Sequence, residues 1–172
     1  MQNRFRTKML LVLISGGYAV GLCRHGVVYC VKHVLRAEGA RDYGDLLVSL
    51  SFKPTITIID FAHVLAKHVN NRKSDFFQPN DGRVATATEE NIIAANNKTL
   101  KPIAVDFENK TATLCLYDKF HESNTNKPEE ILRRTKFIEN LKMKMQVQEQ
   151  FFAKQNKNNY FLNYMGLTKH LF

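Results

Sequence analysis

Asp60 is the residue whose type and position point most directly to chemistry. It ends the β-branched run that opens the stretch ITIIDFAHVLAKH, residues 56–68, which predicts a buried strand over 55–60 and a helix over 61–69. A carboxylate at the carboxyl end of a central strand faces the crevice in which α/β folds bind ligands. Several such carboxylates hold two Mg²⁺ ions about 4 Å apart in two-metal enzymes. The alternative is structural, because Asp is a favoured N-cap and Asp60 directly precedes the expected helix.

Two further carboxylates are candidates for the same chemistry. Asp118 ends a second strand-like run, ATLCLYD at 112–118, and this position also suits a turn or cap residue. Glu149 lies in the middle of a helical segment, between Gln148 and Gln150. By itself, a glutamate in that setting is typical of a solvated helix face.

The cysteine and histidine pattern does not favour a zinc site. The spacings within Cys23, His25, Cys30 and His33 are one, four and two intervening residues, whereas structural zinc sites usually pair C-x₂₋₄-C with H-x₃₋₅-H. Cys30 also lies on an expected helix, where we interpret it as a small core residue. The chain has three cysteines, an odd number without tight spacing, which favours a reducing, intracellular compartment.

The charge balance is strongly basic and suggests a polyanionic partner. Lys and Arg number 25 against 16 acidic residues, which gives a formal net charge of +9. Basic and aromatic residues alternate in the C-terminal third, a mixture that suits a phosphate backbone and its bases. The alternative is an amphipathic helix pair with solvated lysines. The residues that we predict to contact nucleic acid are Lys67, Arg133, Arg134, Lys142, Lys144, Lys154 and Lys157.

The N-terminus has the outline of a secretory signal, with three basic residues ahead of the apolar run at 9–14. The run is short, and no small-residue cleavage motif follows it, so we expect a nuclear or cytoplasmic protein rather than a secreted one. No segment reaches the roughly 18 apolar residues that a membrane helix needs, so we expect no membrane partner.

Strands and helices alternate along the chain, which predicts an α/β or α+β fold with a small sheet. We expect a lead-in strand within 1–14 and a single domain over 15–172, with an irregular, turn-rich insertion at about 70–110 that contains one short helix after Thr88. The remaining expected elements are a strand or helix lead-in at 18–22, a helix at 26–38 that stops at Gly39, a helix at 43–52 capped by Asp42, and helices from Pro128 to the end.

Three blocks, in this order, resemble the KDZ-type DDE transposases. GYAVGLCRHGVV at 17–28 is similar to their small-residue run followed by Cys-x-His. ITIIDFAHVLAKH is similar to their strand that ends in Asp, and QEQFFAKQNKNNYFLN at 148–163 lies where the family carries its late catalytic Glu. A closer resemblance, over roughly 15–172, is to transposase-derived segments of fish HMG-box-domain-containing proteins.

This resemblance implies a ribonuclease-H-like fold in which two Asp and one Glu surround two Mg²⁺ ions. Asp60 matches the second acid and Glu149 the late Glu, so both are expected metal ligands. The family's first acid lies upstream of the Cys-x-His block, but residues 1–15 contain no Asp or Glu. We therefore expect an incomplete fold and a degenerate domain that is inactive as a transposase and binds nucleic acid weakly.

Three alternatives remain open. The first is an active nuclease in which Asp118 or Asp106 supplies the missing acid. The second is a protein-interaction module, in which an incomplete sheet docks a partner strand. The third is a secreted protein, from which residues 1 to about 22 are removed.

Overall fold

The computed structural model describes residues 17–23, 27–34, 39–106, 112–119, 121–122, 126–139 and 141. It has a mixed α/β fold, as predicted, with small sheets and several helices. The chain divides into two compact units, one of residues 1–19 and 31–141 and one of residues 20–30 and 142–172. Nearly all the described elements belong to the first unit, which also carries the candidate site.

Two parallel strands, β3 (Ile56–Ile58) and β4 (Leu114–Leu116), form the centre of the first unit. Ile56 pairs with Leu114 and Ile58 with Leu116. The other edge of β4 is also satisfied, because the backbone N–H of Cys115 donates to the carbonyl of Gly82 at 2.9 Å. A strand paired along both edges can be fully buried, and every residue of β4 is.

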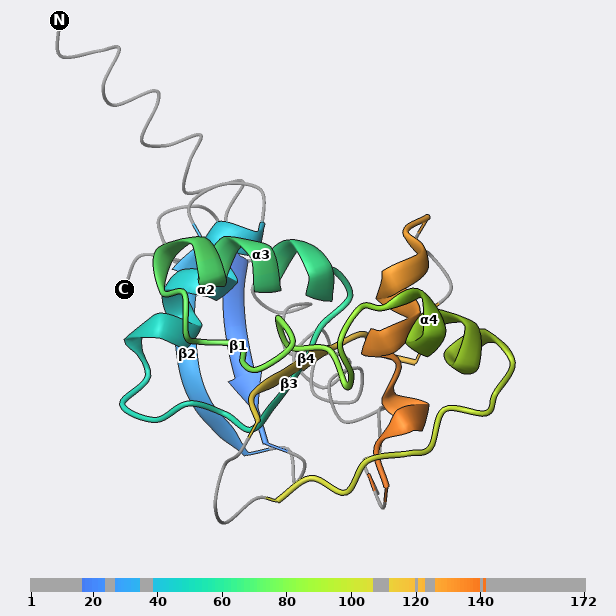
Figure 1. Ribbon diagram of the computed structural model, residues 1–172. Helices are drawn as coiled ribbons and strands as arrows, with labels where there is room; N and C mark the ends of the chain where they lie inside the picture. The colour runs from blue at the N-terminus through green and yellow to red at the C-terminus, as the bar shows by residue number, and fades with distance from the viewer. Residues whose placement is uncertain are drawn as a thin grey trace, which may run out of the picture. The chain divides into compact units, whose positions relative to one another are not determined.

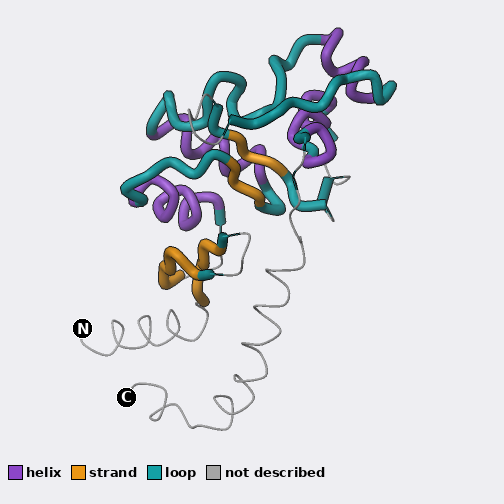
Figure 2. Tube along the Cα trace, turned by 90° about the horizontal axis from the view of Figure 1, so that it is seen from below, coloured by secondary structure: helices purple, strands orange, loops and turns teal. Residues whose placement is uncertain are grey.

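Alternate residues of β4 contribute to two separate cores, as the two-residue period of a strand requires. Cys115 packs with α2 (Ala40–Ser49) and α3 (Ala62–Arg72). Leu114 and Leu116 pack with α4 (Glu89–Asn96) and the short 3₁₀ helices η1 (Pro128–Arg133) and η2 (Thr135–Phe137). The β3–β4 pair therefore lies between two helical layers (Figures 1 and 2).

The predicted helix behind Asp60 is confirmed as α3, which begins at Ala62 and extends to Arg72. Four residues recur at helical spacing on the face of α3 toward β4, and none of them has exposed surface. They are Ala62, Leu65, Ala66 and Val69. Val64 lies off that face and is 43% exposed.

An ionic cluster joins α2 to its neighbours. Lys32 Nζ lies 2.8 Å from an oxygen of Asp45 and 3.2 Å from one of Asp42. The guanidinium of Arg72, in the last turn of α3, contacts the other oxygen of Asp45. The hydrogen bonds from Lys32 and Arg72 lower the pKa of Asp45 to about 2.

The irregular stretch at 70–110 contributes to the core. Phe76 and Phe77 are buried with α3, and the side chain of Asn70 accepts a hydrogen bond from the backbone N–H of Phe77 at 2.9 Å. The short helix predicted after Thr88 is confirmed as α4. The Thr88 hydroxyl caps it by accepting from the backbone N–H of Asn91.

The helix predicted at 26–38 is wrong. Residues Val28–Val34 form strand β2, which pairs with β1 (Gly17–Leu22). The apolar residues satisfy helical spacing, but the segment is also rich in β-branched residues, and pairing with β1 favours the strand. Gly39 is consequently the residue before α2 rather than a helix stop.

Several predicted boundaries also change. Helix α2 begins at Ala40 with Gly39 as N-cap, so Asp42 lies in the first turn and does not cap it. The helix predicted from Pro128 is two 3₁₀ segments up to Phe137. The strand predicted at 9–14 and the chain beyond Leu141 lie outside the described residues. Among the described residues, no helix is long and apolar enough to cross a membrane.

Candidate metal centre

Asp60 and Asp118 occupy equivalent positions at the carboxyl ends of the two parallel strands. Ile58 is paired with Leu116, and each aspartate comes two residues later in its own chain segment. The ladder continues past the strand ends, because the backbone N–H of Ile59 donates to the carbonyl of Leu116 at 3.0 Å. Parallel register therefore delivers the two carboxylates to one edge of the sheet, the edge at which α/β folds bind ligands.

His121 completes a group of three residues that can hold a metal ion. One ligand atom from each of Asp60, Asp118 and His121 lies within 4.8 Å of the other two. Asp60 is exposed, while Asp118 and His121 are half-buried, so solvent and a ligand can reach the group. Two carboxylate oxygens and an imidazole nitrogen are ordinary ligands for a divalent cation.

A tight turn after β4 positions His121 against Asp118. The backbone N–H of His121 donates to a carboxylate oxygen of Asp118 at 2.9 Å, and Nδ1 of the ring lies 2.9 Å from both carboxylate oxygens. The hydrogen bond to Asp118 is the main cause that raises the pKa of His121, and the charges of Asp118 and Asp60 add to it. Both carboxylates therefore stabilise the positively charged form of the His121 imidazole.

The interpretation of Asp60 as a helix cap is wrong. The N-cap of α3 is Phe61, and no side chain accepts a hydrogen bond from the first turn. The first turn of helix α3 is stabilised instead by tertiary packing, because Ala62 and Leu65 are fully buried. The Asp60 side chain is consequently available at the sheet edge.

A buried polar network lies directly beside the site. Tyr117 precedes Asp118, and its hydroxyl donates to Glu130 at 3.4 Å and lies 2.6 Å from Nδ1 of His63. Burial raises the pKa of Tyr117 far above its usual value, so the phenol stays neutral. Glu130 also accepts from Arg133 Nε at 2.6 Å within η1, so the hydrogen bond from Tyr117 joins the chain after β4 to η1.

Arg133 is a buried structural residue and not a surface cation. It is 2% exposed and donates to the carbonyls of Asp81 at 2.7 Å and Cys115 at 3.1 Å, besides Glu130. This removes Arg133 from the predicted nucleic-acid surface. Arg134 is half-buried and Lys67 is exposed on α3. The other predicted contacts, Lys142, Lys144, Lys154 and Lys157, lie outside the described residues.

The structure brings together residues that the sequence analysis treated separately. Glu149, the predicted partner of Asp60, lies outside the described residues. Asp118 takes that place beside Asp60, while Asp106 is exposed and does not belong to the group. His121 was missed, although the spacing Asp-x-x-His in DKFH places an imidazole one turn beyond the acid.

The cysteines form no such centre in the part of the chain that the structure describes. Cys23, Cys30 and Cys115 are not joined by a disulfide. Cys115 is fully buried, which raises the pKa of its thiol to about 12. Cys30 lies on β2 rather than on the predicted helix and is half-buried.

Comparison with known proteins leaves the site to be interpreted from its own geometry. The chain matches no protein-family model, no curated protein and no solved structure.

Proposed function

We propose that this chain is a transposase-derived domain that binds one divalent cation on Asp60, Asp118 and His121 and, with it, a phosphate of nucleic acid, without cleaving the chain. The observation that carries this proposal is the convergence of two carboxylates and an imidazole within 4.8 Å at the carboxyl edge of β3 and β4. A bound cation supplies a positive charge to which a phosphate oxygen coordinates.

The charge of the group favours one cation over two. Asp60 and Asp118 together carry two negative charges, which balance a single divalent ion, whereas two Mg²⁺ ions carry four positive charges. The described group holds two carboxylates and no third one. A two-metal mechanism for phosphodiester cleavage needs a richer carboxylate set, so we propose binding without cleavage.

The imidazole favours a first-row transition ion. Carboxylate oxygens suit Mg²⁺ and Mn²⁺, while imidazole suits the later ions of that row, such as Fe²⁺ and Zn²⁺. Mg²⁺ retains most of its water and rarely takes a nitrogen ligand. His121 therefore distinguishes this group from the all-carboxylate Mg²⁺ site that the resemblance implies.

Two observations support a nucleic acid as the phosphate source. The formal net charge is +9, which attracts polyanions over long range. The three blocks that resemble DDE transposases include ITIIDFAHVLAKH, and this block carries Asp60.

The test is the cation dependence of duplex binding. We expect the affinity of the chain for a fluorescein-labelled DNA duplex, measured by anisotropy, to rise about 10-fold when Mn²⁺ replaces EDTA, and we expect Asp60→Asn and Asp118→Asn to abolish that rise. Asp75→Asn is the matched control, because its side chain is 71% exposed and lies outside the group. An equal Mn²⁺ effect in Asp60→Asn would contradict the proposal.

The alternative of an active nuclease has its own readout. Nicking of supercoiled plasmid in Mg²⁺ that disappears in both Asp60→Asn and Asp118→Asn would show that these acids catalyse cleavage, and it would overturn the binding-only proposal.

A further inference from the structure

Three cations converge from two segments that are far apart in the sequence. Lys98 lies in the turn after α4 with a φ of 60°. Arg134 and Lys136 come from the junction of η1 and η2. The two segments run side by side, because Ile103 and Ile138 form a parallel bridge. Backbone pairing therefore holds the three side chains in one region.

The charges of Arg134 and Lys98 both act on the ammonium of Lys136. Burial lowers the pKa of Lys136 first, the charge of Arg134 lowers it next, and the charge of Lys98 adds to this against the opposing carboxylate of Glu122. The Lys136 ammonium also lies over the Phe137 ring, 4.7 Å from its centroid. Because Phe137 is buried, this contact fixes the ammonium at the surface above the core.

In the part of the chain that the structure describes, no carboxylate forms an ion pair with this group, although the charge of Glu122 acts on Lys136. None of the three cations forms an ion pair there, whereas Lys32, Arg72, Arg83 and Arg133 all do. Glu122 accepts hydrogen bonds from Thr135, at 2.9 Å from its backbone N–H and 2.6 Å from its hydroxyl, so its charge offsets one of the three cations and leaves an excess of positive charge.

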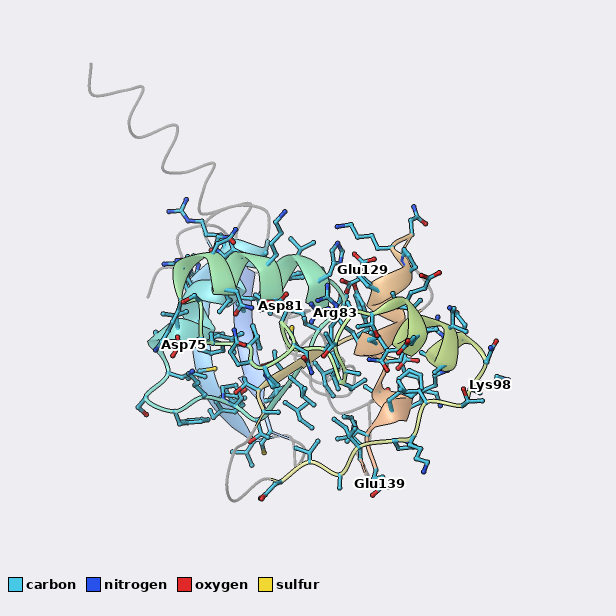
Figure 3. The ribbon with its side chains drawn as sticks, in the orientation of Figure 1. Asp75, Asp81, Arg83, Lys98, Glu129 and Glu139 are labelled. Carbon is cyan, nitrogen blue, oxygen red and sulfur yellow. The ribbon has the colours of Figure 1, made fainter. Side chains whose placement is uncertain are left out.

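Lys98 projects from the loop after α4 and stands apart from Glu129 and Glu139 (Figure 3). Arg134 Nε is buried without a hydrogen-bond partner, so part of the guanidinium is already desolvated. The positive charge that remains in excess produces mutual repulsion, and a bound anion would relieve it.

We propose that Lys98, Arg134 and Lys136 form a basic ridge that binds the phosphodiester backbone of a nucleic acid. Phosphate suits this set because a guanidinium binds it in a forked geometry and two ammonium groups add point charges. The ridge offers no exposed aromatic ring for base stacking, since Phe137 is buried. It therefore reads the backbone and not the base sequence.

The ridge shares the nucleic-acid partner of the proposed function, but it does not rest on the cation. Its contacts are direct and remain in EDTA, whereas the contact at Asp60 and Asp118 requires a divalent ion. A chain that binds a duplex in EDTA through the ridge and shows no Mn²⁺ effect would support the ridge and refute the cation proposal. The reverse result would refute the ridge alone.

The experiment compares two triple variants that lose the same charge. Lys98→Ser/Arg134→Gln/Lys136→Ser removes the ridge. The control removes three exposed cations that form no ion pair in the described part of the chain and are not among the predicted nucleic-acid contacts, namely Arg41→Gln/Lys73→Ser/Lys127→Ser. Duplex binding is measured by anisotropy in EDTA over a range of KCl concentrations. Because Arg134 is half-buried, Lys98→Ser/Lys136→Ser is measured as well, and thermal unfolding checks each fold.

We expect the ridge triple to weaken duplex binding at least about 10-fold and to reduce the slope of log K against log salt by about three, since each neutralised phosphate contributes about 0.9. We expect the double variant to reduce that slope by about two and the control triple to leave it nearly unchanged. Equal losses in the ridge and control triples would overturn the proposal. Binding of poly-glutamate with the same affinity as the duplex would also overturn it, because the ridge would then read negative charge of any kind.

Discussion

Glu130 is the carboxylate on which the stability of the region beside the site depends most. It is 3% exposed and accepts from Arg133 Nε at 2.6 Å and from Arg83 Nη2 at 3.1 Å. Substitution Glu130→Ala leaves the Arg133 charge buried without its counter-charge. Removing one partner of such a pair costs about 3–5 kcal/mol.

The remaining contacts place the expected loss at the lower end of that range. Arg133 keeps its hydrogen bonds to the carbonyls of Asp81 and Cys115, and the hydroxyl of Tyr117 can turn to His63. We therefore expect Glu130→Ala to lower the free energy of unfolding by about 3 kcal/mol.

The adjacent acid gives a matched control. Glu129 is the neighbour of Glu130 in η1 and is half-buried rather than buried, so Glu129→Ala should change the free energy of unfolding by less than about 0.5 kcal/mol. Urea unfolding at neutral pH, followed by circular dichroism, measures both variants. If Glu130→Ala and Glu129→Ala unfold within about 1 kcal/mol of each other, the buried network does not hold η1 to β4 as described.

Three further predictions test the frame around the site. Gly82 has a φ of 76°, and a Cβ there would lie 2.8 Å from the backbone N of Cys115, so Gly82→Ala should cost about 2–4 kcal/mol in urea unfolding. Gly39→Ala meets open space and should cost less than about 1 kcal/mol, which is the loss expected for Ala at the N-cap of α2. Thr88→Ala should lower the free energy of unfolding by about 1 kcal/mol, because α4 loses its side-chain cap. The pKa of Asp45 is lowered from 3.8 to about 2, so its contribution to the free energy of unfolding is complete above about pH 4 and is lost as the pH falls toward 2. In Asp45→Asn, the melting temperature should therefore vary less with pH between 4 and 2. The free energy involved is less than about 1 kcal/mol, because the Asp45 side chain is 33% exposed.

The strand-then-helix order around Asp60 could be predicted because local signals and tertiary packing agree there. The β-branched run gives β3, and the apolar spacing that follows it gives α3. The short helix after Thr88 could be predicted as well, and the structure adds that the Thr88 hydroxyl caps it. For β3, α3 and α4, the local sequence pattern and the tertiary contacts favour the same secondary structure.

The segment at 28–34 shows why other elements could not be predicted. Its apolar residues fit a helical face, and its β-branched residues fit a strand equally well. The choice is made by pairing with β1, which is a nonlocal contact that no window of sequence contains. The predicted helix was wrong for that reason.

Only part of the candidate metal centre could be predicted from the sequence, for a similar reason. Asp60 and Asp118 were each recognised as an acid that ends a strand. Their meeting depends on the parallel register of β3 with β4, which follows from tertiary pairing. His121 joins them through a turn whose geometry the sequence indicates only by an Asp-x-x-His spacing.

The most direct test of the central claim is a calorimetric titration of the chain with Mn²⁺. The geometry predicts one bound ion for each chain, and we expect its affinity to fall at least about 10-fold in Asp60→Asn and in Asp118→Asn but not in Asp75→Asn. Binding that survives both substitutions unchanged, or the lack of any binding to the unaltered chain, would show that the two acids at the carboxyl edge of the sheet are not a metal centre.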